Sequence, residues 1–416
     1  MSSNKNLQLK SMYQENDVVT RWKTLKLGDL CRSISETYRN NDSEVILVNT
    51  SDVLNGKILN HKKVENKNLK GQFKKTFKKG DILYSEIRPA NRRYAYIDFD
   101  ETDQYIASTK LMVIRPDKSK IVPKFLVTYL SSERVLSELQ QLAETRSGTF
   151  PQITFNSELA PMPICVPNIE YQKKILSILQ PLNDKIELNN AINENLEKQA
   201  EAIFKSWFVD FEPFGGAKPS SWIVESLGNV CHCSLGGTPS RSNPEYWNGD
   251  IPWINSGEVN NFRIIRPSEY ITKLGLNKSA TKLLSAKTTV IAITGATLGQ
   301  VSLLEIDTCT NQSVVGVTPS NQLPYEFVYP YIKSNIEKLI SHQTGGAQQH
   351  INKQNVESLS VIIPPSDIIK CYTNLVKDLY SSISVNCFEN EKLVKLRDAL
   401  LPKLMSGEID VSNVNI

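Results

Sequence analysis

The sequence predicts a mixed α/β (α+β) protein in which two globular domains are separated by an antiparallel pair of long coiled-coil-like helices. Residues 167–205 and 364–402 are two copies of one helical segment, with ten identities in 39 positions at a constant shift of 197. An internal repeat of this length determines architecture before any single residue does, and it gives the chain a pseudo-twofold axis. The block before each copy opens alike, with Trp22, Leu27, Gly28 and Cys31 recurring as Trp222, Leu227, Gly228 and Cys231.

Within each block, short runs of β-branched and aromatic residues alternate with turns, as is typical of strands. In the first block we expect strands at 45–48, 81–87, 94–99, 111–114 and 162–166, and a helix at 124–144. The second block repeats this order, with strands at 288–294, 300–305, 313–318 and 359–363 and a helix at 325–342.

At 416 residues the chain is too long for one core. The predicted organisation is a polar N-terminal tail (1–17), globular domain 1 (18–165), a central helical spacer (166–214), globular domain 2 (215–362), and a distal helical spacer with a C-terminal tail (363–416).

Each helical copy carries apolar residues at alternating spacings of three and four, the pattern of a coiled-coil seam, interrupted midway by asparagines. Pro181 is expected to begin or kink the first helix, and Pro402 and Gly407 to stop the second. The expected seam residues are Leu182, Ile186, Asn189, Asn193, Leu196 and Ile203 in the first copy and Leu379, Ile383, Asn386, Asn390, Leu393 and Leu400 in the second.

The order of the segments predicts antiparallel helices, because the first leads from block one to block two and the second must return. An axis near residues 191 and 388 then places Asn189 opposite Asn390, and Asn193 opposite Asn386. Buried seam amides cost stability but penalise slipped registers; the alternative is that they face solvent or a partner helix. From residue 181 to 209 the helix would be roughly 43 Å long, comparable with the ~34–36 Å of one DNA turn.

Composition excludes several classes of protein. The chain is 40% hydrophobic and has no run of eighteen apolar residues, and its N-terminus is polar, so we expect neither a membrane span nor a secretion signal and predict a cytoplasmic location. Seven cysteines, an odd and sparse count, fit reduced thiols. The net charge of +4 is uneven: residues 57–93 hold twelve Lys/Arg against three acids. A local basic excess is typical of a phosphate-binding footprint, with a solvated lysine-rich loop as the alternative.

Short motifs occur in the same order in which a known family has them. Residues 183–189 (Asn-Asp-Lys-Ile-Glu-Leu-Asn), 202–211 (Ala-Ile-Phe-Lys-Ser-Trp-Phe-Val-Asp-Phe) and 396–409 belong to the helical copies, and residues 236–240 (Gly-Gly-Thr-Pro-Ser), 243–247, 249–254 and 295–299 to block two. Together they resemble the specificity (S) subunit of type I restriction–modification systems, over nearly the whole chain. Block one matches at 80–89 but departs at 31–35, where Cys-Arg-Ser-Ile-Ser replaces Gly-Gly-Thr-Pro-Ser.

The resemblance implies a non-catalytic reader of double-stranded DNA, with each globular block a target-recognition domain for one half of a bipartite, asymmetric site. It implies docking of two methyltransferase (M) subunits, which transfer a methyl group from S-adenosylmethionine to adenine, and of restriction/translocase (R) subunits that use ATP and Mg. No cofactor is then expected in this chain. The departure in block one implies that the two half-sites differ.

Base reading needs bidentate groups, arginine for guanine and asparagine or glutamine for adenine, whereas lysines on phosphates position without specifying. For any one of these residues, the alternative is an ordinary solvated loop. The candidate DNA-binding residues are Lys74, Lys75, Lys78, Lys79, Arg88, Asn91, Arg92, Arg93, Arg146, Thr149 and Gln152 in block one and Thr238, Ser240, Arg241, Asn243, Thr297, Gln348, Gln349 and His350 in block two.

Catalytic motifs are incomplete. Residues 243–246 (Asn-Pro-Glu-Tyr) mimic the Asn-Pro-Pro-Tyr element of adenine methyltransferases, but Glu245 replaces a proline and no glycine-rich methyl-donor loop follows a strand. Residues 231–233 (Cys-His-Cys) lack a second Cys/His pair at zinc-ligand spacing, so we expect no metal. The alternatives are therefore a standalone methyltransferase with fused recognition domains, or a coiled-coil scaffold that never contacts DNA. Trp207 and Phe208 are predicted either to dock a methyltransferase or to pack helix one onto block two.

Overall fold

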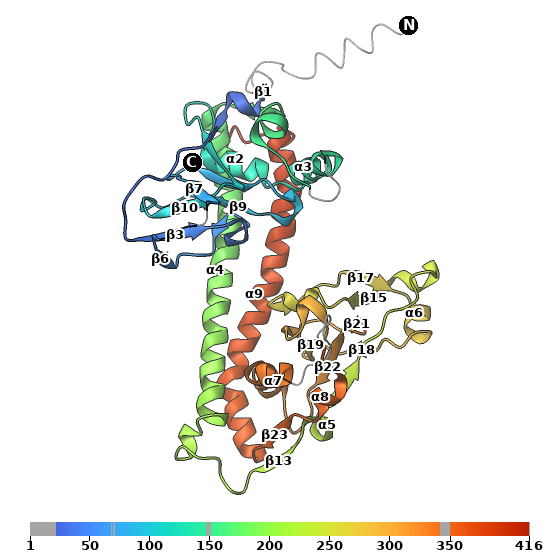
Figure 1. Ribbon diagram of the computed structural model, residues 1–416. Helices are drawn as coiled ribbons and strands as arrows, with labels where there is room; N and C mark the ends of the chain where they lie inside the picture. Colours follow the sequence, from blue (N-terminus) through green and yellow to red (C-terminus); the bar gives the residue numbers. More distant parts are fainter. Residues whose placement is uncertain (1–21, 68, 70, 147–150, 342–349, 416) are drawn as a thin grey trace, which may run out of the picture. The chain divides into compact units, whose positions relative to one another are not determined.

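The computed structural model describes residues 22–67, 69, 71–146, 151–341 and 350–415, and the chain divides into two compact units (Figure 1). Unit 1 comprises Met1–Asp184 and Leu393–Ile416, and unit 2 comprises Lys185–Lys392. Two long helices, α4 (Ile169–Phe208) and α9 (Ser366–Ser406), each contribute one part to unit 1 and the other to unit 2. The predicted domain boundaries differ from this division, because they treat each helix as a segment of its own.

Unit 1 contains two four-stranded sheets, with orders β6-β3-β10-β7 and β2-β11-β8-β9, and the strand pairs β1-β12 and β4-β5. Two helices, α2 (Pro123–Leu130) and α3 (Glu133–Arg146), share a hydrophobic core with the sheet β2-β11-β8-β9. The strands are β1 (Trp22–Lys26), β2 (Cys31–Ile34), β3 (Glu44–Val48), β4 (Val53–Leu54), β5 (Lys57–Ile58), β6 (Lys63–Glu65), β7 (Phe73–Lys75), β8 (Ile82–Ser85), β9 (Tyr94–Tyr96), β10 (Tyr105–Ser108), β11 (Leu111–Pro116) and β12 (Pro163–Pro167).

Unit 2 contains a five-stranded sheet, β14-β22-β19-β20-β16, a four-stranded sheet, β17-β15-β21-β18, and the pair β13-β23. Its shorter helices are α5 (Leu227–Val230), α6 (Lys273–Asn277), α7 (Tyr325–Ile340) and α8 (Lys353–Glu357). The strands are β13 (Ile223–Ser226), β14 (His232–Leu235), β15 (Trp247–Ile254), β16 (Arg263–Ile264), β17 (Glu269–Ile271), β18 (Leu283–Leu284), β19 (Thr289–Ala292), β20 (Val301–Leu304), β21 (Thr308–Thr310), β22 (Val314–Thr318) and β23 (Ser360–Ile363).

The two units have the same sheet topology. In the four-stranded sheet β6-β3-β10-β7, the central strands β3 and β10 are parallel, and each pairs with its outer neighbour in antiparallel fashion. The sheet β17-β15-β21-β18 of unit 2 has the same arrangement, with β15 and β21 as its parallel central strands. The other sheet is antiparallel through β2-β11-β8-β9 and through β14-β22-β19-β20, with β16 added in parallel in unit 2. Mixed α/β architecture and the tandem repeat, both predicted, are therefore confirmed.

The repeated sequence at the start of each block makes the same contact in both units. The Leu27 amide donates to the Met162 carbonyl, and the Leu227 amide to the Leu359 carbonyl, both at 2.9 Å. These acceptors differ by the shift of 197 that relates the two copies. The following glycine permits a close approach, because a Cβ at Gly28 would lie 3.1 Å from the Ala160 Cβ and one at Gly228 would lie 2.8 Å from the Glu357 Cβ.

Within each unit the two long helices run antiparallel, as predicted. In unit 1 the Tyr171 hydroxyl donates to Asp410 at 2.9 Å, and the Arg397 Nη1 donates to Asn183 at 3.3 Å. In unit 2 the Asn189 Nδ2 donates to the Asn390 Oδ1 and the Asn386 Nδ2 to the Asn193 Oδ1, both at 2.9 Å. The predicted amide partners thus face each other, and Asn189 and Asn193 are buried.

The remaining seam residues are apolar and flank these amides. Ile383 is buried, and the side chains of the others are half-buried. The half-buried apolar seam residues are Leu182, Ile186, Leu196, Ile203, Leu379, Leu393 and Leu400, and the amides Asn386 and Asn390 are half-buried as well.

Two predicted helix boundaries are wrong, and of the two alternatives for Pro181 the structure excludes a helix start. Pro181 lies inside α4, which already begins at Ile169, and Pro402 lies inside α9, which ends at Ser406. Proline removes one helix hydrogen bond, but the buried neighbours Leu179 and Leu401 hold the helix by packing. Gly407 does stop α9, with φ at +78°. The single helix predicted at 124–144 is interrupted after Leu130, at two serines whose hydroxyls bond carbonyls of the preceding turn.

A buried charge cluster joins the long helix α4 to the sheet of unit 2. The Arg263 guanidinium, with 1% of its side chain exposed, donates to Glu197 of α4 at 2.5 Å and to the Tyr329 hydroxyl at 3.0 Å. Lys333 of α7 also reaches Glu197, at 3.0 Å. Burial alone would raise the pKa of Glu197, but the charges of Arg263 and Lys333 hold it below its ordinary value.

None of the helices in the described ranges has both the length and the hydrophobicity that a bilayer span requires.

Replacing Arg263 by methionine should destabilise unit 2 strongly. The substitution leaves the Glu197 carboxylate buried without its main counter-charge, and breaking such a pair costs about 3–5 kcal/mol. Urea unfolding followed by tryptophan fluorescence measures this. Lys198→Ala, which removes an exposed ion pair with Glu194 on the same helix, is the matched control and should leave the midpoint unchanged. Equal midpoints for both variants would contradict the assigned role of Arg263.

Candidate nucleic-acid interface

In unit 2, four segments far apart in sequence meet where strands end. The Thr238 hydroxyl, in the loop after β14, donates to Gln312 at 2.6 Å. The Ile293 amide at the end of β19 donates to the Ser313 carbonyl at 2.9 Å, and Thr294 forms an antiparallel bridge with His350. We call the segments 236–243, 294–299, 311–313 and 350 the unit 2 loop edge. Thr297 belongs to this edge and donates to the Thr294 carbonyl at 3.3 Å.

The loop of residues 236–243 places its polar side chains in different ways. Ser240 is exposed and bonds Ser242, whereas the half-buried Asn243 side chain accepts from the Glu245 amide and so begins a short helical turn. Arg241 is exposed and pairs with Glu269. Gln348 and Gln349, also predicted here, lie outside the described residues.

Unit 1 has an equivalent edge. Ile87, in the loop after β8, bridges Gln152 in antiparallel fashion, and the Arg88 amide donates to the Pro151 carbonyl at 3.1 Å. The bridge between Thr294 and His350 is its counterpart in unit 2. We call residues 86–93 with 151–152 the unit 1 loop edge. Thr149 lies outside the described residues.

The arginines of the unit 1 loop edge differ in whether they already form hydrogen bonds or ion pairs within the protein. Arg88 is exposed, and Asn91 beside it is exposed as well. Arg92 pairs with Glu133 of α3. The Arg93 Nη1 donates to the Ser51 carbonyl at 2.9 Å, so this side chain holds the loop before β4. One terminal nitrogen of Arg93 therefore already serves the protein backbone, and its predicted contact with DNA stays a prediction.

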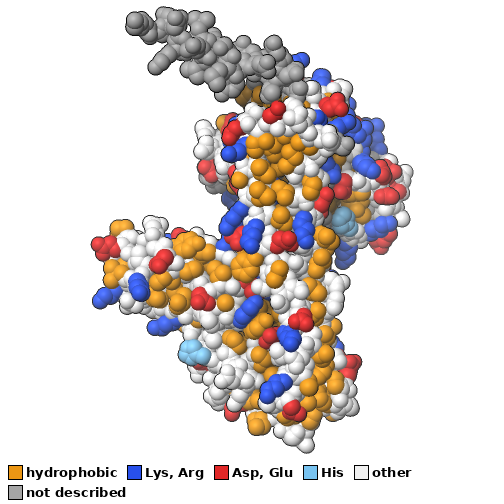
Figure 2. Space-filling view, turned by 180° about the vertical axis from the view of Figure 1, so that it is seen from behind, with side chains coloured by type: hydrophobic (Ala, Val, Ile, Leu, Met, Phe, Trp, Pro, Cys, Tyr) orange, Lys and Arg blue, Asp and Glu red, His pale blue; other side chains and the backbone are white. Residues whose placement is uncertain are grey.

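The four predicted lysines divide in the same way. Lys74 and Lys78 are exposed, and lysine and arginine side chains gather on the outer part of unit 1 (Figure 2). The Lys75 ammonium instead donates to the carbonyls of Thr109 and Leu111, at 2.9 and 2.8 Å. Burial lowers its pKa. Lys75 is thus engaged within the protein, and its predicted phosphate contact stays a prediction. Lys79 is exposed but pairs with Asp100 at 2.6 Å.

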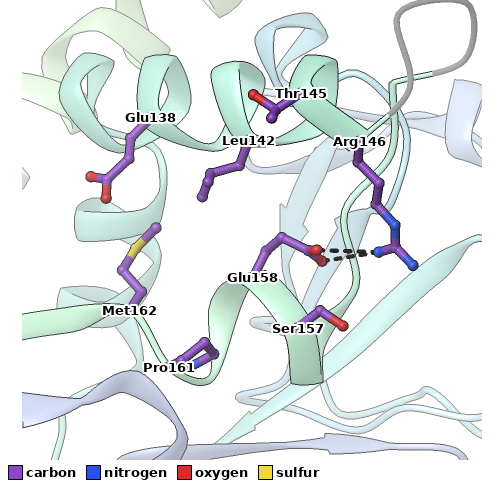
Figure 3. Close-up of a pocket in the computed structure, with 8 residues that line it drawn as sticks. All are labelled: Glu138, Leu142, Thr145, Arg146, Ser157, Glu158, Pro161 and Met162. Atoms are coloured by element: carbon purple, nitrogen blue, oxygen red, sulfur yellow. Dashed lines mark hydrogen bonds and ion pairs between the residues drawn. The ribbon is translucent and has the colours of Figure 1, made fainter.

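Arg146 borders a shallow pocket of about 390 Å³ between α3 and the turn of residues 155–159 (Figure 3). Its Nη1 lies 3.2 Å from a Glu158 oxygen, and Glu158 also accepts from the Thr154 amide at 2.6 Å. Glu138 and Met162 line the other side. The ion pair holds Arg146 against the turn, so its guanidinium is partly committed within the protein.

The two aromatic residues for which docking or packing was predicted lie against other aromatic rings. Phe208 is 5% exposed and packs against Phe327 and Tyr372, with ring centroids 4.9 and 4.8 Å away. Trp207 is half-buried against Phe214 and Tyr372. Of the two alternatives, the structure therefore supports packing of helix α4 onto block two. A docking role is no longer needed to explain either aromatic.

The cysteine-rich strand is part of the core. Cys231 and Cys233 are buried and His232 between them is exposed, as expected for alternating residues of β14. Burial raises the pKa of Cys231 to about 11 and that of Cys233 to about 12, so these thiols stay protonated. Across the described residues, no group of three or more His, Cys, Asp and Glu side chains is placed to hold a metal ion.

Sequence reasoning missed two residues of the unit 2 loop edge region, Trp247 and Glu269. The Arg241 guanidinium carbon lies 3.7 Å from the centre of a Trp247 ring, and its Nη2 lies 2.6 Å from a Glu269 oxygen. Glu269 is 28 positions from Arg241, on β17, and no local pattern in the sequence links the two.

Comparison with known proteins agrees with the repeat. A family model described as "Type I restriction modification DNA specificity domain" matches residues 20–198 and again 219–385. The Type I restriction enzyme HindI specificity subunit of Haemophilus influenzae is 35% identical over 460 residues, which cover 93% of this chain and 99% of that protein. The MjaIX specificity subunit of Methanocaldococcus jannaschii is 28% identical, covering 71% of each. A solved type I S subunit from M. genitalium has a similar fold, with a TM-score of 0.53, 16% identity, and coverage of 94% and 98%.

The two neighbouring lysines of β7 should respond differently to substitution. Lys75→Met removes the donor from two backbone carbonyls and should lower the free energy of unfolding by about 1–3 kcal/mol. Lys74→Met removes an exposed charge from the same strand and should leave stability unchanged. Thermal or urea unfolding of both variants checks this, and a Lys75 variant as stable as the wild type would refute the structural assignment.

Proposed function

This chain belongs to the type I restriction modification DNA specificity family, and we propose that it reads a bipartite, asymmetric DNA site, one half with each loop edge. The observation that carries the proposal is the recurrence of one loop edge in both units. The bridges between Ile87 and Gln152 and between Thr294 and His350 set polar loops at equivalent strand ends. Because the exposed side chains differ between the two edges, the two half-sites differ.

The proposed reading residues are those that the structure leaves accessible. On the unit 1 loop edge they are Arg88 and Asn91, with Lys74 and Lys78 as phosphate contacts. Arginine offers a bidentate donor pair to guanine and asparagine a donor and an acceptor to adenine. On the unit 2 loop edge the candidates are Thr238, Ser240, Arg241, Thr297 and His350.

We propose that the chain catalyses no reaction itself and that its partner subunits carry out methylation and restriction. Two M subunits would bind S-adenosylmethionine and methylate adenine, and R subunits would use ATP and Mg to restrict unmodified DNA, all in the cytoplasm. A self-contained methyltransferase is the competing function. Asn243 argues against it, because the side-chain oxygen of this residue caps a turn through the Glu245 amide. Calorimetry of the isolated chain with S-adenosylmethionine decides between the two, since only the competing function requires binding.

We propose further that the register of α4 against α9 fixes the number of base pairs between the half-sites. The facing amides of Asn189 with Asn390 and of Asn193 with Asn386 support this, because a slipped register would leave buried amide groups without partners.

Deleting the gene from a host that expresses its M subunits should remove adenine methylation from one bipartite motif. The motif should be asymmetric, and a plasmid copy of the gene should restore it. Single-molecule sequencing of native DNA measures this directly. An unchanged set of methylated adenines, with the M subunits expressed, would contradict the proposed function.

Binding of the assembled complex to DNA should weaken steeply as salt is raised. Lys74→Ala and Lys78→Ala should each lower affinity for all sequences alike and reduce the slope of log K against log salt by about 1. Lys79→Ala, whose ammonium already pairs with Asp100, should change the slope less. The slope is measured by fluorescence anisotropy between low and physiological salt, and identical slopes for all variants would remove these lysines from the interface.

A further inference from the structure

Resting on the proposed function, we propose that Arg241 reads a guanine, with Glu269 and Trp247 as positioning residues that hold its guanidinium ready. The three side chains line a surface pocket of about 470 Å³ in unit 2, together with Asn248, Ser268 and Tyr270. The pocket adjoins the unit 2 loop edge, because Arg241 and Thr238 belong to the same loop.

Arg241 is held from two directions. Its Nη1 donates to one Glu269 oxygen at 2.9 Å, and its Nη2 lies 2.6 Å from the other, so the carboxylate takes the outer end of the guanidinium fork. The guanidinium carbon also lies over the Trp247 ring, 3.7 Å from its centre. Side chains of the pair are 55% and 40% exposed, so the group is fixed in direction and still open to solvent.

Trp247, over which Arg241 lies, is itself held by several contacts. The Trp247 indole nitrogen donates to the Ser240 carbonyl at 3.1 Å, and its ring meets the buried Trp253 edge-on at 5.3 Å. A bulge follows, in which Trp247 and Ile251 both pair with Ile271. Gly249 lies in this bulge, where a Cβ would come within 2.5 Å of the Ile271 carbonyl oxygen.

This geometry favours a base over a phosphate as the ligand. Glu269 neutralises Arg241, and the pair carries no net charge with which to attract the DNA backbone. Both terminal nitrogens, Nη1 and Nη2, already face Glu269. The edge of the guanidinium on the Nε side still has donor hydrogens, and among the described residues the structure records no partner for Nε. Two parallel donors on that edge match the O6 and N7 acceptors that guanine presents in the major groove. Holding the arginine in place beforehand lowers the entropy lost on binding.

The test uses the complete chain with its M subunits, in the host described above, carrying Arg241→Ala or Arg241→Lys. The wild-type motif should contain a guanine in one half that both variants relax to any base, with every other position unchanged. Lysine cannot replace arginine there, because it lacks the planar fork. In DNA binding, preference for guanine over other bases at that position should fall by about 5- to 150-fold.

Glu269→Gln should keep the guanine preference but weaken it, since the amide still accepts from Arg241 without the charge. A merely structural role of Glu269 would lower thermal stability and leave the preference intact. Arg266→Lys, an exposed arginine in the same unit, is the matched control and should leave the motif unchanged.

Two results would overturn this inference. One is an unrelaxed motif in Arg241→Ala at normal methylation levels. The other is equal weakening on all sequences with a shallower salt slope, which identifies Arg241 as a phosphate contact. Absence of any wild-type motif would instead sink the proposed function, so the two failures are distinguishable.

Discussion

The antiparallel pairing of the first strand of each block with its last, β1 with β12 and β13 with β23, closes the block on itself directly before a long helix begins. The amides of Leu27 and Leu227 lock this closure, and the glycine after each permits the close approach. Because the loop edges lie on segments between the closing strands, their meeting is a consequence of the same closure. A defect here would disturb sheet, helix origin and loop edge together.

The two units share this backbone topology but differ in the polar side chains that it carries. In unit 1 the buried Asp81 holds Arg115 through two hydrogen bonds of 2.8 Å, and in unit 2 the cluster around Arg263 ties sheet to helix. The loop edges differ more, with arginines on one and small hydroxyl side chains with an Arg–Glu pair on the other. Divergent side chains on a repeated scaffold are what an asymmetric target requires.

The contacts that could be predicted from the sequence are those that follow from a regular repeat or spacing of residues. The shift of 197 and the seam spacing predicted the partners of Asn189 and Asn193 correctly, because two regular helices leave few registers. They could not predict that α9 continues through Pro402, since packing of distant blocks outweighs the local cost. The partners of Lys75, Arg93 and Phe208 were out of reach for a related reason. Charge and hydrophobicity are visible locally, whereas the carbonyls of Thr109 and Ser51 or the ring of Phe327 are brought near only by the fold.

The turn that ends α9 lies against β1. Gly407 lies so near Trp22 of β1 that a side chain there would come within about 3 Å of the indole. Among the described residues, the first strand and the last helix therefore touch inside unit 1. A permuted chain that joins these two regions and opens at 215–221, between α4 and β13, would keep the described strand pairs of each unit and both long helices.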